Sequence, residues 1–119
     1  MTPLVVLATV IAGSLGAVMR LLILDGLRNH ASRFVAVVVV NIVGSALAGG
    51  ILTLPQTTLT TVIVMGLAGG LTTFSTVAVL LVPTPHGPRV PLLVARALLH
   101  SGAPVVAAWG SFQIVQLVT

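Results

Sequence analysis

Long apolar runs alternate along this chain with short stretches rich in polar residues, glycine and proline. The runs are continuous rather than alternating residue by residue, which favours helices over strands. Each run is long enough to cross the ~30 Å hydrocarbon core of a bilayer, for which a helix uses about 20 residues. The expected spans are residues 3–24, 34–54, 59–82 and 91–118. The pattern therefore predicts an all-α membrane protein with four transmembrane helices, and residues 1–119 as one integral membrane domain.

Composition excludes a water-soluble fold, because only 5% of the 119 residues are charged and 57% are apolar, whereas soluble domains carry about 25% charged residues. There is no Lys, and the five Arg are scattered, so we expect no nucleic-acid partner. Cys is absent, which excludes disulfides and cysteine metal sites. The segment Met1–Leu4 lacks the positive region of a signal peptide, so the first run is expected to be a retained span.

The arginines are all expected on one side of the bilayer. Arg28 and Arg33 lie in the first loop and Arg89 in the third, while Arg20 and Arg96 lie near the same ends of their spans. The second loop and both termini carry none. Because positive residues stay cytoplasmic, we expect a multi-pass protein of the cell membrane with both termini extracytoplasmic.

Small and polar residues recur at steps of four in the first span, at Ala8, Ala12, Gly16 and Arg20. The first three are typical of a helix-packing stripe. Two interpretations of Arg20 stay open: its side chain snorkels to the interface, or it stands near an anion path.

Asn41, Ser45 and Gly49 share one face of the second span. A carboxamide in hydrocarbon needs partners, and its NH2 group can donate to an anion. An interhelical hydrogen bond explains Asn41 equally well.

The third span holds the strongest feature, because two glycines, Gly69 and Gly70, precede four hydroxyl residues within positions 72–76. Such a sequence is a poor continuous helix, and we expect a break. Carbonyls freed there can coordinate a cation such as Na+, and amides and hydroxyls can face an anion. The positive edge of the Phe74 ring can also contact an anion; an apolar plug is the alternative.

The fourth span carries His100, Ser101 and Pro104. Proline cannot bond the carbonyl of His100, so we expect a kink there and a free carbonyl. A single His with no embedded acid beside it is more often a packed residue, so His100 is left outside the main mechanism. Trp109, Phe112, Gln113 and Gln116 indicate an interfacial end.

In order, these residues resemble the CrcB/Fluc family of fluoride channels. The matching motifs are Gly13-x-x-Gly16-Ala17-x-x-Arg20, Asn41-x-x-Gly44-Ser45 and, most specifically, Gly66-x-x-Gly69-Gly70-Leu71-Thr72-Thr73-Phe74-Ser75-Thr76. The resemblance implies a dimer of antiparallel four-span subunits with two narrow fluoride paths and a structural Na+ at the dimer interface.

Residue roles follow from the same resemblance. The carbonyls of Gly69 and Thr72 are expected to ligate Na+. By the resemblance Asn41 and Phe74 are expected to line the fluoride path, with Arg20 near its aqueous vestibule. The hydroxyl residues Ser45, Ser75 and Thr76 are further candidates for the same path.

Three positions depart from the family pattern: Val77 stands where a second Phe is usual, Leu80 where a Glu is frequent, and Ala46 where a Phe often follows Gly-Ser. One-sided arginines also disagree with a homodimer, since an antiparallel homodimer needs one sequence that inserts both ways. We therefore expect a heterodimer with an oppositely oriented paralogue that supplies many of the missing pore residues.

The expected function is a fluoride-specific channel subunit, not an enzyme, that passively exports cytoplasmic fluoride and so reduces its toxicity. Two alternatives stay open. A proton-coupled small-molecule exporter needs an embedded carboxylate, but the only acid, Asp25, lies at a loop edge. A non-conducting structural subunit of a heterodimeric channel is the other, favoured by Ala46, Val77 and Leu80.

Overall fold

The computed structural model describes residues 2–119, and all regular elements within that range are helical. They are α1 (Pro3–Leu27), α2 (Arg33–Ile51), α3 (Thr58–Thr61), the π-helical segment η1 (Val62–Ala68), α4 (Gly69–Leu71), α5 (Ser75–Leu80) and α6 (Val90–Val118). Four segments are long and apolar enough to cross a membrane: α1, α2, Thr58–Leu80 and α6. The predicted all-helical, four-span architecture is confirmed. Met1, part of the predicted domain and of the retained N-terminus, lies outside the described residues.

Hydroxyl side chains begin three of the four spans. Thr2 accepts a hydrogen bond from the backbone N–H of Val5, and Ser32 accepts one from Val35. Thr57 and Thr60 form a reciprocal capping box at the start of the third span. These caps satisfy N–H groups that the first turn of a helix leaves without backbone partners. The helix starts therefore follow from local sequence.

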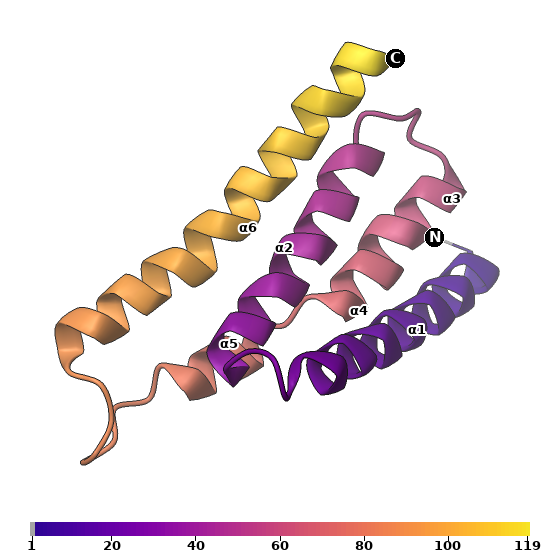
Figure 1. Ribbon diagram of the computed structural model, residues 1–119. Coiled ribbons are helices and arrows are strands. Elements are labelled where there is room, and N and C mark those ends of the chain that lie inside the picture. The colour runs from indigo at the N-terminus through magenta and orange to yellow at the C-terminus, as the bar shows by residue number, and fades with distance from the viewer. Residues whose placement is uncertain (1) are drawn as a thin grey trace.

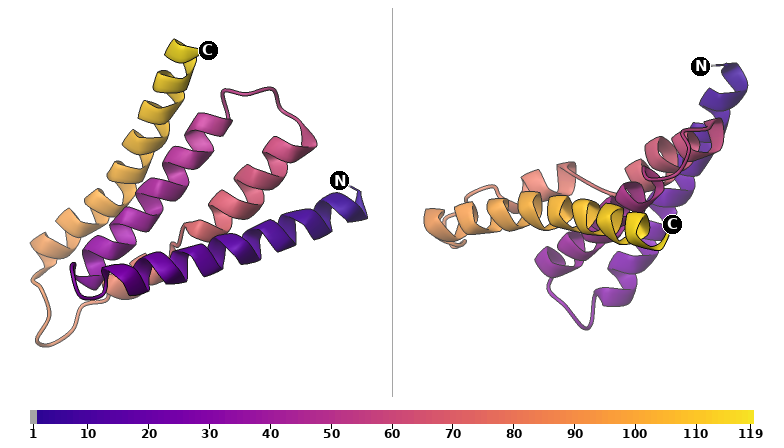
Figure 2. Two further views of the ribbon diagram at one scale, coloured as in Figure 1. Left: turned by 45° about the vertical axis from the view of Figure 1, so that its right-hand side comes forward. Right: turned by 90° about the horizontal axis from the view of Figure 1, so that it is seen from above.

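The spans lie side by side in the order α6, α2, third span, α1 (Figures 1 and 2). Glycines allow close contact between neighbours: a Cβ on Gly16 would overlap the carbonyl of Leu67, and one on Gly70 would overlap the carbonyl of Gly13. The predicted stripe on α1 is therefore a packing surface. Gly49 plays the same part between α2 and α6, where a Cβ would overlap the carbonyl of Ala108.

This arrangement buries little of the outer helices. Gly16 is the one buried residue of α1, and Leu93 and His100 are the buried residues of α6. Broad apolar faces are thus open to lipid or to another subunit.

Both loops that carry arginine, residues 28–32 and 81–89, lie at one end of the bundle, and the loop at 52–57 lies at the other (Figure 1).

The third span is broken within the predicted stretch, at the hydroxyl residues and not at the glycine pair. Gly69 and Gly70 remain helical, and the chain leaves the helix at Thr72, whose ψ of 157° is extended, before α5 begins at Ser75. Gly70 is used for contact with α1 instead. α6 continues as one helix through Pro104, where the sequence predicts a kink.

Candidate functional site

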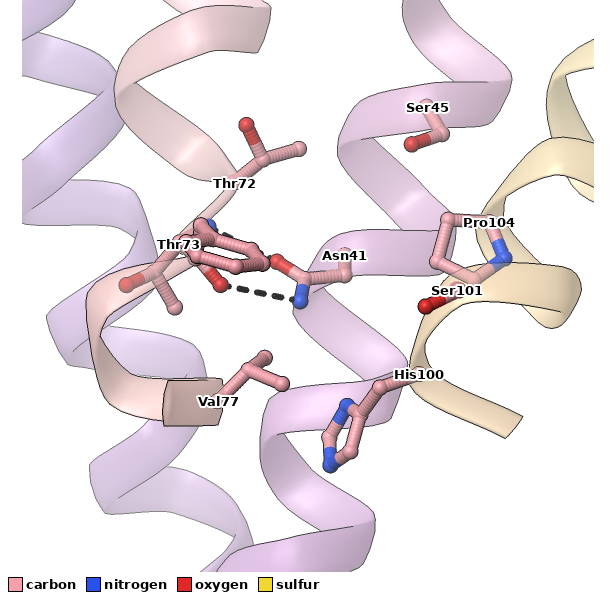
Figure 3. Close-up of a pocket in the computed structure, with 9 residues that line it drawn as sticks. Asn41, Ser45, Thr72, Thr73, Val77, His100, Ser101 and Pro104 are labelled. Atoms are coloured by element: carbon pink, nitrogen blue, oxygen red, sulfur yellow. Dashed lines mark hydrogen bonds between the residues drawn. The ribbon is translucent and has the colours of Figure 1, made fainter. Parts of the chain in front are cut away.

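The break is held by Asn41 of α2. Its Oδ1 accepts a hydrogen bond from the backbone N–H of Thr73 at 2.7 Å, and its Nδ2 donates to the carbonyl of Thr73 at 3.1 Å (Figure 3). Asn41 and Thr73 are both more than nine-tenths buried. The carboxamide therefore replaces two backbone bonds that the helix gives up here, and one N–H of Nδ2 remains for another acceptor. Of the two roles that the sequence allows for Asn41, the hydrogen bond to another span is therefore present.

Arg20 of α1 reaches the same break from the other side. Its Nη1 donates to the carbonyl of Thr72 at 2.9 Å, across 52 residues of sequence. A charged donor on a partly buried carbonyl makes a stronger bond than a neutral one. The guanidinium is thus fixed beside the break and adds positive charge to it.

Three hydroxyls form a chain from the break into α5. Thr73 Oγ1 donates to Thr76 Oγ1 at 3.1 Å and lies 3.3 Å from Ser75 Oγ. It also accepts a hydrogen bond from the backbone N–H of Thr76 at 3.3 Å, which caps the first turn of α5. Because hydroxyls both donate and accept, the chain can turn its O–H groups toward a negative ion.

A pocket of about 250 Å³ opens between the break, α2 and α6 (Figure 3). Its lining residues are Asn41, Ser45, Thr72, Thr73, Phe74, Val77, His100, Ser101 and Pro104. We call it the clamp pocket. Three predicted path residues, Asn41, Ser45 and Phe74, therefore share one space, and Phe74 is 82% exposed. An aromatic ring this exposed at mid-span is available to a neighbouring subunit or an ion.

A second pocket of about 240 Å³, here called the arginine pocket, is lined by Arg33, Ser75, Thr76, Val79 and Leu80. The predicted path residues Ser75 and Thr76 thus lie apart from Asn41 and beside a fixed positive charge. The hydroxyl of Thr73 connects the two sets, because Thr73 lines the clamp pocket and bonds to both residues of the arginine pocket. Arg20 lines neither pocket but holds the break between them.

The two carbonyls expected to bind Na+, those of Gly69 and Thr72, accept few hydrogen bonds at the break. Within residues 2–119 no backbone N–H donates to the Gly69 carbonyl, because Thr73, its helical partner, bonds to Asn41 instead. The Gly69 oxygen accepts only a 3.3 Å bond from Thr72 Oγ1. The Thr72 carbonyl keeps one lone pair beside the Arg20 bond. Neutral carbonyl oxygens at an unwound helix end have the donor chemistry that suits Na+. At Thr72 the ion would share the oxygen with the positively charged Arg20 side chain.

Eight residues that line these pockets were not predicted as site residues: Arg33, Thr73, Val77, Val79, Leu80, His100, Ser101 and Pro104. In the sequence Arg33 indicates only the orientation of the chain, and His100 is expected to be a packed residue. Val77 and Leu80, noted as departures, line the clamp pocket and the arginine pocket respectively. Ala46 lies elsewhere, where its carbonyl accepts a 2.7 Å bond from Ser111 Oγ. No spacing rule links α6 to Asn41, so only the packing of α2 on α6 brings His100 into the site.

A comparison of the chain with known protein families finds one match, and it includes the motif of the third span. The family model described as "CrcB-like protein, Camphor Resistance (CrcB)" matches residues 7–112, which include most of α1, all of α2, the break and most of α6. Neither the curated proteins nor the solved structures contain a significant match to this chain.

Proposed function

Because the chain belongs to the CrcB family of membrane channels, we propose that it is one subunit of a passive channel through which accumulated fluoride leaves the cytoplasm. CrcB proteins have a fluoride-related channel or resistance function and are not enzymes. The observation that carries the proposal for this chain is the break at Thr72–Phe74. Asn41 bonds the Thr73 backbone there and so stabilises an unwound segment with backbone and hydroxyl groups at mid-span.

The route we propose runs from the clamp pocket to the arginine pocket. Fluoride in the clamp pocket is met by the remaining N–H of Asn41 and by the edge of the Phe74 ring, while Ser45 borders the same space. The hydroxyls of Thr73, Ser75 and Thr76 then replace lost water along the chain. Arg33 attracts the anion at the far end, and Arg20 contributes positive charge near the break.

A second subunit completes the proposed channel. The clamp pocket is open and Phe74 is largely exposed, so one chain does not enclose a path through a bilayer. We propose an antiparallel heterodimer in the cell membrane, with the termini of this chain extracytoplasmic, because both arginine-bearing loops lie at one end. The carbonyls of Gly69 and Thr72 would hold a structural Na+ at the dimer interface, where it would offset the repulsion between the partial negative charges of facing carbonyl oxygens.

Fluoride efflux from liposomes tests the proposal. The chain is coexpressed with a paralogue of reversed charge bias, and release is followed with a fluoride electrode. We expect Phe74→Ile and Asn41→Asp each to reduce efflux at least tenfold, because the first removes the positive ring edge and the second replaces a donor with a negative charge. Leu98→Ile, on the exposed face of α6, is the matched control and is expected to conduct normally.

Two results would contradict parts of this proposal. Unchanged efflux in both site variants would show a scaffold subunit whose own pockets carry no ion. Robust efflux from the chain expressed alone would contradict the heterodimer but leave the channel intact.

A further inference from the structure

His100 has a feature that the proposed route does not explain. It is only 5% exposed, yet neither ring nitrogen has a hydrogen-bond partner among the described residues. A buried polar group without a partner is costly, and natural proteins satisfy nearly all of them. His100 lines the clamp pocket, and its side chain projects from α6 on the side of Asn41 and Val77 (Figure 3).

The position of the ring is fixed by its neighbours. Phe34 of α2 contacts the imidazole edge to face, with ring centroids 4.6 Å apart and planes at 75°. The guanidinium of Arg96, one turn before His100 on α6, lies 4.9 Å from the centre of the same Phe34 ring. This stack holds the imidazole in place and puts a permanent positive charge nearby.

We propose that an N–H of His100 donates a hydrogen bond to the anion in the clamp pocket, as a protein contact separate from Asn41 and Phe74. An imidazole carries at least one N–H in either protonation state, so a donor is always present. The ligand class is a small, strongly accepting anion, for which fluoride is the best match among halides. This inference rests on the proposed function, because it assigns a further contact along the same path.

Efflux measurements on three variants test the contact. His100→Phe keeps an aromatic ring against Phe34 but has no hydrogen-bond donor. We expect efflux to fall about tenfold, because the anion in the clamp pocket loses one of its donors. His100→Gln keeps an N–H and is expected to stay within about threefold of the unchanged channel. His86→Gln, in the exposed loop before α6, is the control.

The outcomes separate this inference from the proposed function. If Phe74→Ile blocks efflux while His100→Phe conducts fully, the contact is refuted and the channel stands. If the unchanged protein shows no efflux, both are refuted. If His100→Phe does not elute as a folded species, the decision passes to the unchanged channel with 15N-labelled histidine. There a ring 15N shift of His100 on adding fluoride but not chloride supports the contact, and no shift at saturating fluoride overturns it.

Discussion

Two neighbouring regions of the third span satisfy the backbone in different ways. One is the close contact with α1 at Gly16 and Gly70, here called the seam, and the other is the break at Thr72–Phe74. At the seam, Gly16 and Gly70 bring two intact helices together with no side chain between them. At the break, the helix is lost, and long polar side chains from α1 and α2 reach in to bond Thr72 and Thr73. Only a few residues of the third span lie between the close helix contact and the break.

The difference follows from what a bilayer permits. An intact helix satisfies its own N–H and C=O groups, so its contacts need only shape, and glycine gives the closest approach. A broken helix leaves polar groups that lipid cannot satisfy, so other side chains must pair with them. Donors left over after that pairing, such as the second N–H of Asn41, are the groups able to bind an ion.

Removing the two hydrogen bonds between Asn41 and the Thr73 backbone, here called the clamp, is expected to have the largest effect on stability. Asn41→Leu leaves the buried N–H and C=O of Thr73 without partners, and each unmet group costs about 1–3 kcal/mol. We expect a loss of about 3 kcal/mol, measured by chemical unfolding in detergent micelles. Ser45→Ala, one turn further along α2, is the matched control and should change stability by less than about 1 kcal/mol.

An Asn41→Leu protein as stable as the unchanged chain would show that the Thr73 backbone finds other partners. The contrast between the break and the seam would then be lost, because the break would need no side chain from α2.

A methyl group added at the seam is expected to have the next largest effect. Gly16→Ala forces α1 away from the Leu67 carbonyl, and overpacking of this kind costs about 1–3 kcal/mol. Gly26→Ala is the matched control on the same helix, because a Cβ there meets no atom within 4 Å. It should be neutral or stabilising by up to about 1 kcal/mol, since alanine favours a helix. Equal melting temperatures for both variants would contradict close packing at Gly16.

The sequence was sufficient to predict the spans and the presence of a break, because both depend on local composition. Propensity located the break only to the stretch from Gly69 to Thr76. Within that stretch Gly69 and Gly70 remain helical and the chain opens at Thr72. At Gly70 the backbone of Gly13 occupies the space of the missing Cβ, and Gly13 lies 57 residues away in sequence.

The candidate site was only partly predictable for the same reason. The polar character of Asn41 and Arg20 indicated that each must bond within the membrane, but their partners are backbone atoms 32 and 52 residues away. Backbone atoms carry no sequence signature. His100 was set aside because a single histidine on an apolar helix does not reveal what faces it; the contact of α6 with α2 does.

The smallest expected effect separates two roles of Thr73 within the break. Thr73→Val keeps the backbone groups that Asn41 binds, so the clamp remains, but it removes the hydroxyl that caps α5 and bonds to Ser75 and Thr76. We expect a stability loss of about 1 kcal/mol and a several-fold decrease in fluoride efflux, because the connection between the two pockets is lost. Thr73→Ser retains the oxygen and should restore both quantities. If valine and serine variants conduct equally, the hydroxyl serves only as a helix cap, and the ion passes from the clamp pocket by another route.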